Sequence, residues 1–192
     1  MHFISTSIFS ALAVIGSLAI SSVSAQGCSS VNQDALNLIE QYEGLIATPE
    51  KDSTGQQKVG YGHTCTKSGC TDVPYAMPLA KDSAERLLKS DLEGVTECLN
   101  SYISDDVELD YNQWGALVSW AFSVGCTSVK ESTLITRLND GNDANIVAGD
   151  ELPTYNESGG KEIAGLTRRR DAEVKLFQTL STKTAFPECS ED

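Results

Sequence analysis

The sequence has few histidines and few basic residues, and it lacks the patterns that define several classes of protein. Only two histidines occur among its 192 residues, and its six cysteines form no CxxC pair or Cys/His cluster, which argues against a zinc site. Lys and Arg number 14 against 27 Asp and Glu, giving a net charge of −13, and we expect no nucleic-acid partner. Internal repeats, low-complexity tracts and Pro/Ser-rich linkers are also missing. We therefore expect a single domain that needs no metal or cofactor.

The N-terminus contains a charge-free apolar stretch from Phe3 to Ile20. Serines interrupt it, and it is short for a stable membrane span. A small-residue cleavage pattern ends at Ala25, and His2 is the only basic residue ahead of it. These features predict a signal peptide over residues 1–25, with an uncleaved anchor as the alternative. The mature chain, 26–192, would then be secreted and have no membrane association.

The cysteines suit an oxidising compartment, because all six lie after residue 25 and their number is even. Six cysteines allow 15 pairings. Cys65 and Cys70 could close a local loop, and Cys98 and Cys126 lie on two predicted helices of one core. That arrangement leaves Cys28 and Cys189 to join the two ends of the chain.

A first acidic candidate, Glu43, lies at the end of an amphipathic helix. Residues 30–33 (SVNQ) resemble a capping box, and Gly44 is a natural stop. Glu43 therefore lies in the last turn, where the helix dipole disfavours an ionised carboxylate and favours the protonated form that a general acid requires. The alternative is an ordinary surface glutamate. The apolar positions that define this helix are Val31, Ala35, Leu38, Ile39 and Tyr42.

A second acid, Asp52, precedes a turn signal at 53–55 and a predicted strand with glycine at alternate positions. In a strand, Lys58, Gly60 and Gly62 would share one face, with Val59, Tyr61 and His63 on the other. The missing Cβ atoms of Gly60 and Gly62 would let a flat substrate approach the backbone. Two acids beside such a surface suggest a glycoside-cleaving site, in which one protonates the leaving oxygen and the other activates water.

The longest periodic segment predicts a helix over residues 82–102. Asp91 falls on its apolar stripe, and a buried acid needs a partner. His63 is the candidate, so we interpret His63 and Asp91 as a structural ion pair that holds the hairpin to this helix. A catalytic or metal-binding role for His63 is the alternative.

Downstream, residues 110–113 open a further helix, residues 132–138 form a short one, and Asn156 begins a glycosylation sequon.

Three consecutive arginines, 168–170, follow Thr167, which we predict to cap the last helix. Cations in the first turn of a helix oppose its dipole, so the arrangement is reasonable if they face carboxylates. A solvated basic patch is the alternative.

These motifs, in this order, resemble those of the phage-type lysozymes, glycoside hydrolase family 24. The shared residues are Glu43-Gly44, Lys51-Asp52, and Val59-Gly60-Tyr61-Gly62-His63, and the likeness continues to Glu173. The resemblance implies that Glu43 is the general acid and Asp52 the second carboxylate. It pairs His63 with Asp91 and places an arginine, Arg168 or Arg169, against Glu43. Lys58 replaces the family's water-positioning threonine.

The resemblance implies a mainly helical, two-lobed α+β domain with a cleft between its lobes. A hairpin lobe (about 44–80), a connecting helix (about 82–102) and a helical lobe (about 103–192) would follow one another. The expected function is that of a secreted, monomeric muramidase, which hydrolyses the β-1,4 bond between N-acetylmuramic acid and N-acetylglucosamine in bacterial peptidoglycan with inversion of the anomeric configuration. The alternatives are a lytic transglycosylase, a chitinase, or a non-catalytic glycan-binding protein on the same fold.

Overall fold

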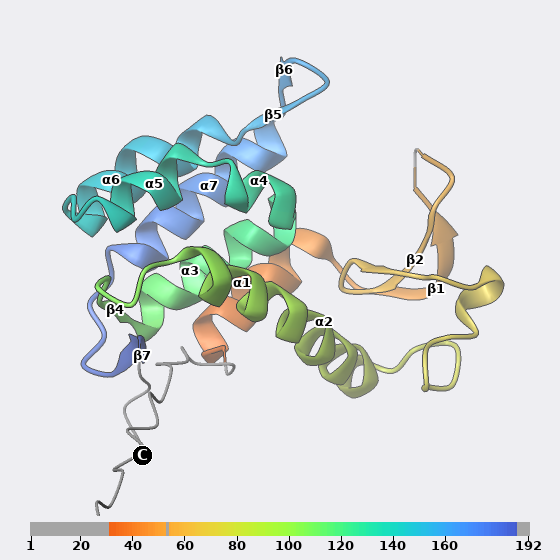
Figure 1. Cartoon of the computed structure of the whole chain (residues 1–192). Coiled ribbons are helices and arrows are strands. Elements are labelled where there is room, and N and C mark those ends of the chain that lie inside the picture. Colours follow the sequence, from red (N-terminus) through yellow and green to blue (C-terminus); the bar gives the residue numbers. More distant parts are fainter. Residues whose placement is uncertain (1–30, 53, 188–192) are drawn as a thin grey trace, which may run out of the picture.

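The computed structural model describes residues 31–52 and 54–187. The predicted signal peptide and the predicted Cys28–Cys189 disulfide therefore lie outside the described residues. Within the described part, the structure confirms the predicted mainly helical α+β fold. Two lobes are visible, a hairpin lobe and a larger helical lobe, and one long helix runs between them (Figure 1).

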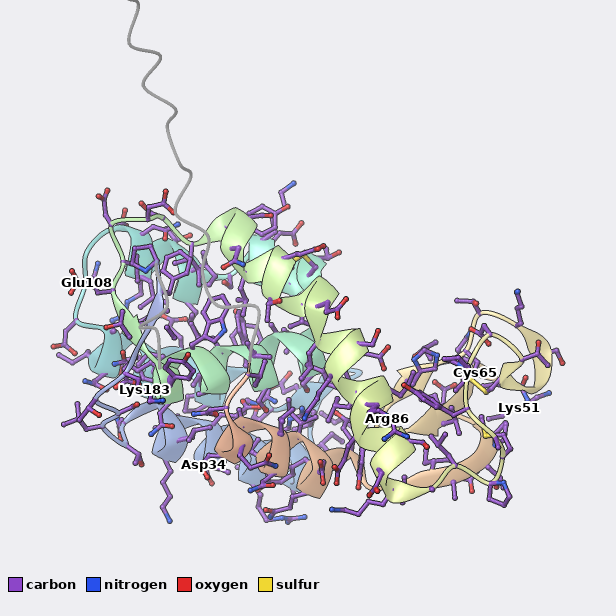
Figure 2. All side chains as sticks on the ribbon, turned by 90° about the horizontal axis from the view of Figure 1, so that it is seen from below. Asp34, Lys51, Cys65, Arg86, Glu108 and Lys183 are labelled. Carbon is purple, nitrogen blue, oxygen red and sulfur yellow. A yellow bond between two sulfur atoms is a disulfide. The ribbon has the colours of Figure 1, made fainter. Side chains whose placement is uncertain are left out.

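The hairpin lobe is a three-stranded antiparallel sheet in the order β1-β2-β3. The 3-10 turn η1 (Ser68–Cys70) follows it, and helix α2 (Lys81–Tyr102) then leads to the helical lobe. In Figure 2, Lys51 and Cys65 mark the hairpin lobe and Glu108 and Lys183 the far end of the helical lobe, with α2 between them. The strands are β1 (Ile46–Lys51), β2 (Gln57–Gly60) and β3 (His63–Thr64).

The helical lobe is built around α3 (Tyr111–Val124), whose side chains are buried on almost all faces. Because α1, α2, α4 and α7 all contact α3, this helix forms the centre of the core. The surrounding helices are α1 (Gln33–Glu43), α4 (Cys126–Lys130), α5 (Thr133–Asn139), α6 (Ala144–Glu151), η2 (Leu152–Thr154) and α7 (Ala164–Phe177). Two short ribbons pair β4 (Leu109–Asp110) with β7 (Thr184–Phe186), and β5 (Glu157–Ser158) with β6 (Lys161–Glu162).

The start of α3 follows the predicted pattern, whereas the start of α1 does not. Asp110 accepts hydrogen bonds from the backbone amides of Asn112 and Gln113, and the Asp110 amide donates to the side-chain oxygen of Gln113, which completes a capping box. At α1 the N-cap is Asn32, so the box predicted to begin at residue 30 is wrong. Asn32 is selected because its side-chain amide also donates to the Tyr111 carbonyl, tying the two helix starts together.

The predicted glycine-alternating strand is also wrong. Gly60 and Gly62 have φ values of +66° and +86°, which an extended strand does not contain. Strand β2 therefore ends at Gly60, and a tight turn through Tyr61 and Gly62 leads into β3. In consequence Val59 pairs with His63 across a hairpin, and the two glycines do not share one face.

Helix α7 begins earlier than predicted, at Ala164, with Ile163 as its N-cap. Thr167 is thus inside the helix, where its hydroxyl donates to Glu162. The three arginines lie beyond the first turn, and the expected conflict with the positive end of the dipole is largely removed, since that effect fades within one turn.

The packing of α1 on α3 gives a prediction about glycine. A Cβ on Gly115 would lie 2.7 Å from the Ala35 Cβ and 2.9 Å from Asn32 Oδ1. Gly115→Ala should therefore lower the free energy of unfolding by about 1–3 kcal/mol, although alanine is the better helix former. A Cβ on Gly94 of α2 would meet no atom within 4 Å, so Gly94→Ala should raise the free energy of unfolding, by up to about 1 kcal/mol. Urea unfolding of both variants tests this pair, and equal shifts of one sign would contradict it.

Candidate active site

A cavity of about 650 Å³ lies where the hairpin lobe, α2 and the helical lobe meet. It is lined by the end of α1, the β2–β3 turn, one face of α2, the end of α3 and the α7 arginine region. The lining residues come from seven elements, α1, β2, β3, α2, α3, α4 and α7, which converge on one space of a size that accommodates a ligand. The ionisable residues in its lining are Glu43, Lys58, His63, Asp91 and Arg169, together with Tyr42.

Glu43 reaches this cavity because α1 ends there. Gly44, with φ +71°, is the C-cap, and its amide donates to the Glu40 carbonyl. A Cβ on Gly62 would lie 2.9 Å from Glu43 Oε2, so only glycine lets this turn approach the acid so closely. Gly60 requires a correction: a Cβ there would meet Leu79 and Leu87, and Gly60 does not line the cavity.

Arg169 is the arginine that meets Glu43. Its Nη1 donates to Glu43 Oε1 at 2.6 Å, and its side chain is only 6% exposed. Arg168 is exposed and does not line the cavity, and its backbone carbonyl accepts a hydrogen bond from the Tyr42 hydroxyl. Arg170 is fully buried and pairs with Glu173. The three neighbouring cations therefore have three different environments.

Asp52 does not line the cavity, although its partner Lys58 does. Its Oδ1 accepts hydrogen bonds from the Thr54 amide, the Thr54 hydroxyl and the Gln56 amide, at 2.8, 2.6 and 3.1 Å. Lys58, which does line the cavity, has its Nζ 3.8 Å from Asp52 Oδ2. The pKa of Asp52 is lowered mainly by the Thr54 hydroxyl, and the charge of Lys58 is the smallest of the contributions.

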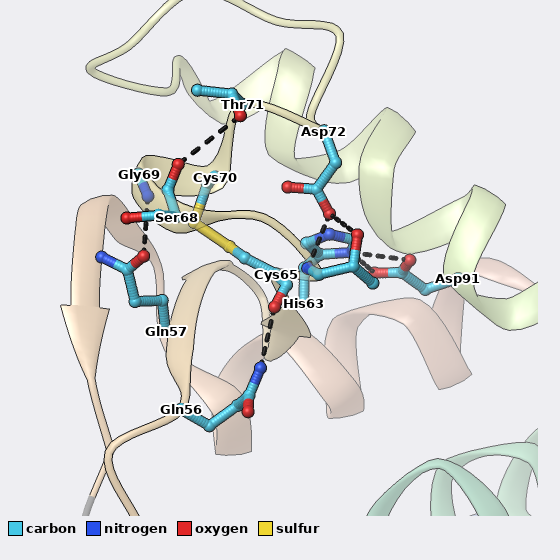
Figure 3. The surroundings of a disulfide bond; sticks show 11 residues. Gln56, Gln57, His63, Cys65, Ser68, Gly69, Cys70, Thr71, Asp72 and Asp91 are labelled. Atoms are coloured by element: carbon cyan, nitrogen blue, oxygen red, sulfur yellow. Dashed lines mark hydrogen bonds and ion pairs between the residues drawn. A yellow bond between two sulfur atoms is a disulfide. The ribbon is translucent and has the colours of Figure 1, made fainter.

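His63 and Asp91 meet between the hairpin lobe and α2. The Nδ1 atom of His63 lies 2.9 and 3.0 Å from the two carboxylate oxygens of Asp91 (Figure 3). Burial raises the pKa of the Asp91 carboxyl, and the contact with His63 opposes that shift. Both residues line the cavity, so this pair joins the hairpin lobe to α2 in the same space that Glu43 lines.

With this geometry established, comparison with known proteins identifies the family. The model of the phage lysozyme family matches residues 40–173, which include Glu43, Asp52, His63, Asp91 and Arg169. The chain belongs to the phage lysozyme family.

Two relatives of this lysozyme family member come from phages. The endolysin of Bacillus phage B103 is 34% identical over 83% of this chain and 58% of the relative. The endolysin of Acyrthosiphon pisum secondary endosymbiont phage 1 is 33% identical over 78% of this chain and 98% of the relative. The chain thus spans about three fifths of the Bacillus phage endolysin and nearly all of the other.

A solved structure has the same fold. The muramidase domain of SpmX from Asticaccaulis excentricus is 28% identical, with a TM-score of 0.66, over 79% of this chain and 99% of that one.

Two disulfides lie in the described part of this phage lysozyme family member, and one of them contributes to the cavity lining. Cys65–Cys70 closes the loop after β3, where Thr66 donates to Asp72 and Gln56 to the Cys65 carbonyl (Figure 3). Cys98–Cys126 ties α2 to the start of α4. Cys98 and Cys126 also line the cavity, a placement that the sequence did not reveal, because it depends on how α2 crosses the helical lobe.

Sequence reasoning missed the role of Glu173, which is buried behind Arg169. Its spacing of three and four positions from the arginines was the available signal. Within residues 31–52 and 54–187, no group of three or more His, Cys, Asp or Glu could hold a metal ion. No helix in the same part of the chain has the length and apolar character to cross a membrane.

The contacts of Asp52 predict which neighbour controls its titration. Thr54→Val removes the hydroxyl hydrogen bond to Oδ1 and should raise the pKa of Asp52, because that bond favours the ionised form. Lys58→Met should raise the same pKa by less. NMR titration of the Asp52 carboxyl carbon measures both, with Thr71→Val as a matched control elsewhere in the lobe. A larger shift in Lys58→Met would show that the ion pair dominates.

Proposed function

We propose that this protein is a secreted muramidase that hydrolyses the β-1,4 bond between N-acetylmuramic acid and N-acetylglucosamine in bacterial peptidoglycan. The observation that carries the proposal is Glu43, which Arg169 holds in the lining of an interlobe cavity in a phage lysozyme family chain. The relatives named endolysin and muramidase support the same activity.

Glu43 is the general acid of this proposal. It protonates the glycosidic oxygen while the bond to the sugar breaks. Arg169 fixes Oε1, and Oε2 lies on the side of Gly62, where the backbone permits close approach of a glycan. The proton is thus delivered from a carboxyl group whose orientation is set before the substrate arrives.

Asp52 and Lys58 form the second group. Because Oδ1 of Asp52 is occupied by the turn, Oδ2 is the oxygen available to orient or activate water beside Lys58. Attack on the face opposite the leaving group inverts the anomeric centre, as the family resemblance implies.

Secretion is supported by the compartment that disulfides require. Cys65–Cys70 and Cys98–Cys126 are bonded, and such bonds persist in oxidising environments. The charge-free stretch before Ala25 is the exporting segment in this proposal.

Product analysis distinguishes the proposal from its rivals. Purified peptidoglycan should yield new reducing ends of N-acetylmuramic acid by mass spectrometry, and chitin should be cleaved far more slowly. Anhydro-sugar ends would indicate a lytic transglycosylase, preferential cleavage of chitin a chitinase, and binding without cleavage a non-catalytic protein.

The two carboxylates give a direct mutational prediction. Glu43→Gln should lower kcat by about 10²–10⁴-fold and leave the fold intact, because the general acid is lost. Asp52→Asn should also be severe, since water would no longer be oriented by a carboxylate. Rates of reducing-end release and circular dichroism measure the two effects. Nearly full activity of Asp52→Asn would rule out the two-acid mechanism.

The net charge of −13 predicts how lysis depends on pH and salt. Bacterial walls are anionic, so enzyme and target should repel each other at neutral pH and low salt. Protonation of carboxylates weakens that repulsion, and Glu43 must be protonated to act. Whole-cell lysis should therefore be faster at mildly acidic pH than at pH 7, and added salt should help at pH 7 by screening. A short uncharged oligosaccharide is the control and should show little salt dependence. Salt inhibition of lysis would contradict the argument.

A further inference from the structure

Three charged side chains of α7 are buried behind the cavity. Arg169 is 5% exposed, and Arg170 and Glu173 are 0% exposed. Charged residues are almost never buried so completely unless they are paired. Ser119 of α3 is equally buried and faces them, so the cluster lies in the interface between α7 and the central helix.

Glu173 is the hub of this cluster. Its Oε1 accepts hydrogen bonds from the Ser119 hydroxyl at 2.7 Å, Arg170 Nη2 at 2.9 Å and Arg169 Nε at 3.2 Å. Arg170 Nε lies 2.8 Å from Oε2. Burial raises the pKa of the Glu173 carboxyl, but the two guanidinium groups oppose that shift, and every one of these neighbours donates to the carboxylate. These donors favour the ionised carboxylate against the effect of burial, although Arg170 Nη1 has no hydrogen-bond partner among the described residues.

Arg169 is held at each of its three nitrogens. Nε donates to Glu173, Nη2 donates to the Ser119 carbonyl at 3.1 Å, and Nη1 donates to Glu43 at 2.6 Å. A planar guanidinium fixed at two nitrogens has no freedom to rotate the third. The position of Nη1, and hence of the Glu43 carboxylate, is set by groups behind it.

We propose that Glu173 is a positioning residue for the reaction, which anchors Arg169 and balances its charge so that Glu43 is correctly oriented and can be protonated. This inference rests on the proposed muramidase function. Glu173 does not line the cavity and acts only through Arg169.

The charge of Glu173 affects the protonation of Glu43 as well as its position. With Glu43 ionised, Glu43 and Glu173 balance the charges of Arg169 and Arg170, and with Glu43 protonated, as the acid must be, Glu173 is the one carboxylate that faces these two arginines in the cluster. Without Glu173, two guanidinium groups face one carboxylate, and this excess favours ionised Glu43. The other ionisable groups around Glu43 are Tyr42 on α1 itself and Lys58, His63 and Asp91 on the hairpin lobe and α2, and the substitution leaves them unchanged.

Glu173→Gln tests the proposal. We expect kcat to fall about 10- to 100-fold with KM nearly unchanged, because the acid is misplaced and substrate contacts are intact. The alkaline limb of the kcat/KM profile should move to lower pH, because the unbalanced positive charge of the two arginines favours the ionised form of the acid. A merely structural role for Glu173 would lower stability and leave this limb in place.

The double variant Arg170→Gln with Glu173→Gln separates charge from anchoring. It removes one charge of each sign, so its alkaline limb should return to the wild-type position while kcat stays reduced. If Glu173→Gln alone fails to fold, the double variant decides. A reduced kcat of the double variant with an alkaline limb in the wild-type position supports the proposal, and a wild-type kcat of the double variant overturns it. An unmoved limb in folded Glu173→Gln, or an equally displaced limb in the double variant, also overturns it.

Glu151→Gln is the matched control. Glu151 also pairs with an arginine, Arg137 of α5 at 2.8 Å, but it lies outside the cavity lining. This variant should keep the wild-type kcat and pH profile. Absence of cleavage by the wild-type protein would refute the proposed function itself, whereas an active wild type with an unaltered Glu173→Gln would refute only this inference.

Discussion

The ion pair between Arg169 and Glu43 is the contact on which the site depends. It joins α7 to the end of α1 across 126 positions of sequence, and both helices pack on α3. A charged pair this close to the interior is stable only if its remaining donors are satisfied. Ser119 and Glu173 accept these hydrogen bonds, so the candidate acid is linked through Arg169 to buried residues of the helical lobe.

The two lobes are held in register by contacts of different kinds along α2. Near the hairpin, His63 pairs with Asp91. Further along, Cys98–Cys126 fixes α2 to α4. Each of these contacts borders the cavity, so the same groups that stabilise the interlobe angle also shape the space between the lobes. Two unrelated interactions at two points restrict rotation more than either does alone.

The electrostatics of the site differ from those of the whole molecule. The chain carries −13, yet Lys58 and Arg169 both line the cavity beside Glu43. Glu43 and Asp91 also line it, so the lining holds two cations and two acids and is less acidic than the molecule as a whole. An anionic wall would then be repelled by the outer surface more than by the cleft. Behind the cavity, the carboxylate of Glu173 balances one of the two positive charges of Arg169 and Arg170.

The sequence by itself determined the features that depend on near neighbours. Gly44 ends α1 and leaves Glu43 in its last turn, the apolar stripe defines α2 within one position, and Asp110 and Gln113 form the capping box of α3. These signals act over a single turn of helix, so they can be recognised without a fold.

Only the tertiary structure decided the rest. Gly60 faces Leu79 and Leu87, whereas Gly62 faces Glu43, and a turn at Tyr61 lies between them where a continuous strand was predicted. Three adjacent arginines are nearly equivalent in sequence, but they lie on different faces of α7. Arg168 is exposed to solvent, Arg169 pairs with Glu43 and Arg170 pairs with Glu173. A partner 126 positions away is chosen by which faces pack together, and no local pattern contains that information.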